Sequence, residues 1–94
     1  MDKLMFIGSK EFETGNHKDF IVYYYIQFNE AEEAYGIRLE KKYYDNQKEF
    51  EYAEEKGITE SRMVAEELAN YLIHYDVTPV SLPETLDAYF EEQE

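Results

Sequence analysis

The segment Phe20–Phe28 reads FIVYYYIQF and is the most apolar stretch of this 94-residue chain. Successive side chains of a β-strand point to opposite faces, so a strand between two environments shows a period of two. One face of this segment carries Phe20, Val22, Tyr24, Ile26 and Phe28. We therefore predict a strand over residues 19–29, with Tyr24 in the core and Tyr23 and Tyr25 on the opposite face.

Three further segments have strand patterning. Residues 3–13 carry Leu4, Phe6 and Phe12 on one parity, residues 34–44 alternate apolar with charged side chains, and a short strand is expected over residues 49–53. Gly15-Asn16 favours a hairpin turn, because both residue types tolerate positive φ. Residues 45–48 are polar and predict a second turn. The pattern indicates an antiparallel meander of three or four strands.

The period changes after residue 58. Thr59 is the predicted cap of a helix over residues 60–75, whose apolar stripe is Met63, Val64, Leu68, Tyr71, Leu72 and Tyr75. Pro79 ends this helix, because proline holds the preceding residue extended. Ser81 and Glu84 match a capping box for a second helix over residues 82–91, with Leu82, Leu86, Tyr89 and Phe90 facing inward. Two helices on one face of a sheet predict a two-layer α+β fold, a single domain over residues 1–94.

Charge is the strongest compositional signal. The chain holds 22 acidic and 9 basic residues, a net charge of −13, and residues 48–94 hold 13 of the acids but 3 of the bases. Such a field repels nucleic acid and anionic membranes, and it favours a protein partner with a basic surface. Solubility alone is the simpler explanation. The absence of cysteine excludes disulfides and thiolate chemistry, and no segment has the length of a membrane span, so we expect a cytoplasmic protein.

The sequence offers no catalytic signature. His17 is expected in a hairpin loop and His74 near a helix end, and no serine lies in a nucleophile motif. The four glycines are far apart, and the carboxylate pairs lack the spacing of a calcium loop. We therefore predict a non-enzymatic protein with no catalytic residue, cofactor or metal. A carboxylate-based enzyme remains an alternative.

Two sets of residues are candidates for partner binding. The acidic set is Glu54, Glu55, Glu60, Glu66 and Glu67, whose carboxylates can imitate the phosphates of nucleic acid and block a basic groove. The aromatic set is Tyr23, Tyr25 and Tyr44, because exposed tyrosines contribute strongly to protein interfaces. The first set predicts an inhibitor of the nucleic-acid-mimic type, and the second predicts a self-associating domain, such as a homodimer.

Two segments, Glu33–Glu40 (EAYGIRLE) and Val77–Leu86 (VTPVSLPETL), together with the order of elements, resemble an uncharacterised family of small acidic proteins. This family, a domain of unknown function from Gram-positive bacteria, would cover about residues 5–92. In size and charge the chain is also similar to anti-restriction and anti-CRISPR inhibitors from phages. The resemblance implies a fold and a bacterial or phage host, and it supplies no catalytic residue.

Overall fold

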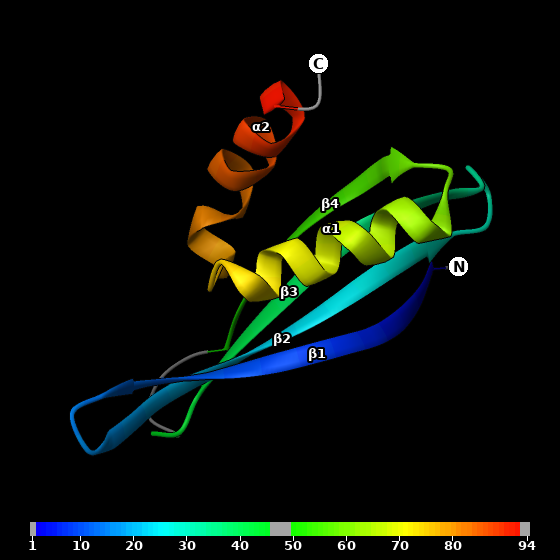
Figure 1. Ribbon diagram of the computed structural model, residues 1–94. Helices are drawn as coiled ribbons and strands as arrows, with labels where there is room; N and C mark the ends of the chain where they lie inside the picture. The colour runs from blue at the N-terminus through cyan, green and yellow to red at the C-terminus, as the bar shows by residue number, and fades with distance from the viewer. Residues whose placement is uncertain (1, 46–49, 93–94) are drawn as a thin grey trace.

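The computed structural model describes residues 2–45 and 50–92. Four antiparallel strands form one sheet in the order in which they follow along the chain, and the helices come after them (Figure 1). The elements are β1 (Asp2–Thr14), β2 (His17–Asn29), β3 (Ala34–Tyr43), β4 (Glu51–Thr59), α1 (Arg62–His74), the short 3₁₀ helix η1 (Pro79–Ser81) and α2 (Leu82–Glu92). The predicted α+β meander followed by two helices is confirmed.

The helices cover one face of the sheet. Helix α1 runs across this face and contacts all four strands, whereas α2 contacts β4 and η1 (Figure 1). The buried strand residues lie beneath α1, and the register places them opposite one another, with Tyr24 beside Leu39 and Ile26 beside Ile37. We call the uncovered side the open face.

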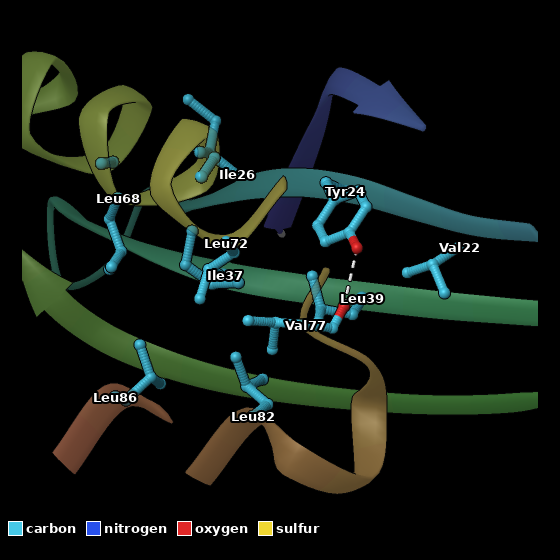
Figure 2. Close-up of a cluster of buried hydrophobic side chains, with 12 residues drawn as sticks. Val22, Tyr24, Ile26, Ile37, Leu39, Leu68, Leu72, Val77, Leu82 and Leu86 are labelled. Carbon is cyan, nitrogen blue, oxygen red and sulfur yellow. Dashed lines mark hydrogen bonds between the residues drawn. The ribbon is translucent and has the colours of Figure 1, made fainter. Parts of the chain in front are cut away.

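The core lies between β2, β3 and the two helices (Figure 2). Tyr24 is fully buried, and its hydroxyl donates a hydrogen bond to the carbonyl oxygen of Val77 at 2.7 Å. This bond satisfies a buried hydroxyl and ties β2 to the segment between α1 and η1. The prediction that Tyr24 belongs to the core is confirmed.

The start and the buried stripe of α1 differ from the prediction. Ser61, not Thr59, caps the helix, and its hydroxyl accepts the N–H of Val64 at 3.2 Å. Thr59 is instead the last residue of β4. The buried residues of α1 are Ala65, Leu68, Ala69 and Leu72, while Met63 and Tyr75 are exposed. Two alanines complete the i, i+3, i+4, i+7 spacing, so the stripe is shifted from the one that the larger side chains predict.

The entry to α2 is also organised differently. The capping box joins Thr78 and Ser81 around η1, where the Ser81 hydroxyl accepts the Thr78 N–H at 3.2 Å. The predicted box between Ser81 and Glu84 is therefore wrong, because a 3₁₀ turn precedes the helix and uses the serine first. Leu82 and Leu86 are buried as predicted, but Phe90 is partly exposed.

Strand β4 is longer than the predicted 49–53 and continues to Thr59, while Glu49 and residues 46–48 of the predicted turn lie outside the described residues. The extension contains a bulge opposite Gly36, since Tyr35 pairs with Thr59 and Ile37 with Glu55. A Cβ on Gly36 would lie 2.2 Å from the backbone oxygen of Glu55. The bulge and the charges of β4 are features of edge strands, which explains why its apolar pattern is weak.

Candidate binding surfaces

The open face carries an aromatic patch. Outward sheet faces are usually polar, but here large apolar side chains come from β1, β2 and β4 and from Tyr44, directly after β3. Phe6 is 57% exposed and Tyr52 is 55% exposed. We define the open-face patch as Leu4, Phe6, Tyr23, Tyr25, Tyr44 and Tyr52. The ring of Phe50 stacks beside Tyr52 at a centroid distance of 6.1 Å and extends the patch at its edge.

A bulge in β1 places two of these residues on the open face. The register shifts between Phe6 and Gly8, so Phe6 pairs with Tyr25 whereas Phe12 pairs with Phe20. Phe12 stacks on Phe20 on the helix side, at a centroid distance of 4.7 Å. Leu4 and Phe6 therefore lie on the opposite side from Phe12, although all three share one parity in the sequence.

Tyr23 and Tyr25 stand side by side in the middle of the patch. The ring of Phe6 lies 6.3 Å from that of Tyr23 and 5.8 Å from that of Tyr25. Both tyrosines are half-buried by their neighbours. Burial, together with the nearby Glu40 carboxylate, raises the pKa of Tyr25. The two rings form a fixed aromatic centre on this face.

The carboxylates in the middle of the open face are paired within the chain. Arg38 donates to Glu40 at 2.8 Å and to Glu54 at 3.0 Å, and its guanidinium lies 4.2 Å from the ring centre of Tyr52. Glu54, predicted as a partner-binding residue, is thus held on the open face by Arg38. Because the Glu54 carboxylate is already paired with Arg38, it is less available to an external cation than the unpaired acids of the helices.

A second ion pair crosses the open face between the two edge strands. Lys56 of β4 lies 3.2 Å from the Asp2 carboxylate of β1, above Gln27 and Gly36. Gln27 donates to Asp2 at 2.8 Å, and this hydrogen bond, followed by Lys56, lowers the pKa of Asp2. The Gln27 side-chain oxygen is buried and has no partner among the described residues.

Tyr44 lies at the far end of the patch. Its hydroxyl donates to the Glu11 carboxylate, which raises the pKa of Tyr44 to about 12. Glu11 also pairs with Lys18 at 3.1 Å, and both contacts lower the pKa of Glu11. The three aromatic residues predicted for partner binding, Tyr23, Tyr25 and Tyr44, therefore share one surface.

The helix side has the opposite character. Residues 60–92, which we call the helix layer, contain eight acidic residues and Arg62 as the single Lys or Arg. Arg62 lies 3.7 Å from Glu66, and Lys10 of β1 pairs with Asp76. The other carboxylates of the layer are exposed and make no hydrogen bond or ion pair with the described part of the chain; they are Glu60, Glu67, Glu84, Asp87, Glu91 and Glu92.

A groove between β4 and α2 joins this layer to the sheet. It has a volume of about 180 Å³ and is lined by Glu55, Pro83, Leu86, Asp87 and Phe90. Glu55 is exposed and, like Asp87, has no ion-pair partner among the described residues. The groove therefore has an apolar floor with carboxylates at its rim.

The two histidines lie on different elements of the fold, His17 at the β1–β2 hairpin and His74 on α1. His17 lines an open pocket of about 320 Å³ at the β1–β2 hairpin, together with Asp19, Phe20, Lys41, Tyr43 and Asp45. His74 lies in the last turn of α1, with its ring 4.8 Å from that of Tyr75. Within residues 2–45 and 50–92, no three His, Asp or Glu side chains are grouped to hold a metal ion. No helix in the same ranges has the length and apolar character to cross a membrane.

The sequence pattern does not predict two features of the open face: the position of Phe6 and Tyr52 on it, and the ion pair between Arg38 and Glu54. The bulge between Phe6 and Gly8 changes the face within β1, so the parity that Phe6 shares with Phe12 does not give the face of Phe6. The short strand expected over residues 49–53 does not tell which face Tyr52 takes. The pairing of Arg38 with Glu54 depends on the β3–β4 register, which the alternation of side chains does not show. The alternation of charged with aromatic residues along β3 and β4 is the feature of the sequence that could have indicated a mixed aromatic and charged face.

Comparison with known proteins gives one match. No curated protein and no solved structure matches the chain. A family model matches residues 3–92, which is nearly the whole chain and includes both layers of the fold. The chain belongs to a family of unknown function, DUF6514.

Proposed function

We propose that this protein is a non-enzymatic interaction module whose helix layer binds a basic surface of a protein partner. The observation that carries the proposal is the set of unpaired carboxylates on α1 and α2. Their side chains are exposed and available to an external cation, in contrast to the paired acids of the open face. A surface of this kind steers a basic partner and sets the register of the contact.

The partner class that fits best is a protein with a basic groove for nucleic acid. Spaced carboxylates on a rigid scaffold can replace a row of phosphates, and the groove beside α2 adds apolar contact through Leu86 and Phe90. In this role the protein acts as an inhibitor, because it occupies the surface that the nucleic acid needs. Such binding weakens as salt rises, because surface charges are screened.

The test is displacement of duplex DNA from basic nucleases of the restriction and CRISPR types, followed by fluorescence anisotropy of labelled DNA. The wild type should release the DNA at low salt. The variant Glu55→Gln/Glu67→Gln/Asp87→Asn removes three unpaired charges and should act at least about tenfold more weakly, a loss of about 1.4 kcal/mol.

The matched control is Glu11→Gln/Glu40→Gln/Glu54→Gln, which removes three carboxylates that are already paired on the open face. This control should displace DNA as well as the wild type does. Equal activity of the wild type and the variant Glu55→Gln/Glu67→Gln/Asp87→Asn, or no displacement from either nuclease type, would refute the proposal.

A further inference from the structure

We propose that the open face is an interface between two copies of this chain, packed sheet against sheet. This inference is independent of the proposed function, because it concerns the opposite side of the molecule. Its basis is the open-face patch, in which Phe6 and Tyr52 are each more than half exposed. Contiguous apolar patches rimmed by polar groups are typical of protein contacts.

Charge argues for a second copy as the occupant. The chain carries −13 overall, so two copies meet only where their surfaces do not repel. On the open face Asp2 pairs with Lys56, and Glu40 and Glu54 share Arg38. Lys42, over the Tyr23 ring, is the third cation beside these three carboxylates. A basic partner would find no free carboxylate there and would favour the helix layer. The same face of a second copy also has its carboxylates paired within its own chain, so the two faces meet without strong electrostatic repulsion.

Packing on the open face also separates the repelling surfaces. In a face-to-face pair both helix layers point outward, with two sheets between them. The molecule measures 18 Å along its shortest axis, so the two acidic layers lie farther apart than the Debye length of about 8 Å at physiological salt. Packing of one helix layer against the other would instead bring the two acidic surfaces into contact.

The available area meets the need of a stable dimer. The two longer dimensions of the molecule are 41 and 31 Å. Coverage of about two thirds of such a face buries roughly 800 Å² per copy, the standard size of a specific interface. A twofold contact uses the same patch on both copies, so Tyr23 and Tyr25 on β2, one of the two central strands, lie near its axis. Tyrosine at the centre of an interface contributes large contact area with few rotatable bonds.

The experiment is sedimentation velocity of the full chain over a range of concentrations. The wild type should associate to dimers, and the double variant Phe6→Ser/Tyr52→Ser should dissociate with a constant at least about tenfold larger. The control Met63→Ser/Val80→Ser changes two side chains that are 69% and 82% exposed in the helix layer. This control should dimerise as the wild type does. A monomeric wild type, or a dimer that only the control weakens, overturns the proposal.

Salt provides a second readout that needs no variant. Screening reduces the repulsion between two copies of charge −13, so dimerisation should strengthen as NaCl rises from about 0.05 to 0.5 M. Binding of a basic partner by the helix layer should weaken over the same range. A dimer that dissociates as salt rises would be held by ion pairs and would contradict packing through the open-face patch.

Discussion

The hydrogen bond from Tyr24 to Val77 links the sheet to the segment that positions α2. The donor is fully buried on β2, and the acceptor is a backbone carbonyl 53 residues later. Replacing Tyr24 with phenylalanine keeps the ring in the core and deletes one oxygen. The change therefore tests a single interaction.

The expected loss follows from the burial of both partners. An intramolecular hydrogen bond contributes about 0.5–1.5 kcal/mol, and a buried carbonyl left without a donor costs about 1–3 kcal/mol. We expect Tyr24→Phe to lower the free energy of unfolding by about 1.5 kcal/mol. For a chain of this length the urea m-value is about 1–1.5 kcal/mol per molar, so the midpoint should fall by roughly 1 M.

The assay is urea unfolding followed by circular dichroism at neutral pH. The matched control is Tyr35→Phe, because Tyr35 is a half-buried tyrosine on the same face whose hydroxyl makes no hydrogen bond to the described residues. The control should shift the free energy of unfolding by less than about 0.5 kcal/mol. Equal midpoints for the two variants would refute the importance of the Tyr24 hydrogen bond.

The remaining predictions concern pH and two local structures. Burial raises the pKa of Tyr24 far above its ordinary value, so above pH of about 10 this tyrosine is deprotonated in the unfolded chain but still protonated in the folded one. The free energy of unfolding should therefore fall by up to about 1.4 kcal/mol per pH unit in that range. Unfolding curves recorded from neutral to alkaline pH should show a weaker fall for Tyr24→Phe, and identical pH slopes would contradict this cause. Gly36→Ala places a Cβ 2.2 Å from the backbone oxygen of Glu55 and should lower the stability by about 3 kcal/mol in thermal unfolding. Gly15→Asn is the comparison: Gly15 lies in a left-handed turn with no atom within 4 Å of an added Cβ, so this change should cost less than about 1 kcal/mol. Ser61→Ala removes the cap of α1 and should cost about 1 kcal/mol, and an unchanged melting temperature would show that the cap contributes nothing.

The sequence predicts the order of elements well because period and turn chemistry are local. The alternation in residues 20–28 identifies both the strand and its buried side, including Tyr24. The face taken by Phe6 and the extent of β4 depend instead on bulges, which shift the parity without a strong sequence signal. The stripe of α1 is shifted because Ala65 and Ala69 supply close packing but little apparent hydrophobicity.

The candidate surfaces were predicted in part. Tyr23, Tyr25 and Tyr44 do lie on one face, as alternation requires. The acidic set divides, because Glu54 belongs to the open face and pairs with Arg38, and Glu66 lies beside Arg62. These pairings depend on the strand register and on the helix turn, so charge counting alone cannot separate bound carboxylates from free ones.

The central claim is that the open face makes contact with a second copy while the helix layer faces solvent. The chain lacks cysteine, so single-cysteine variants take one spin label each. Ser9→Cys places the label on the exposed open face, beside Tyr23, and Asn70→Cys places it on the exposed side of α1.

The decisive measurement is the label-to-label distance within the dimer by double electron–electron resonance. The account predicts a longer distance for Asn70→Cys, about twice the 18 Å thickness of the molecule, and a shorter distance for Ser9→Cys. The reverse order, or no dipolar coupling for either variant at concentrations where dimers are expected, would contradict it.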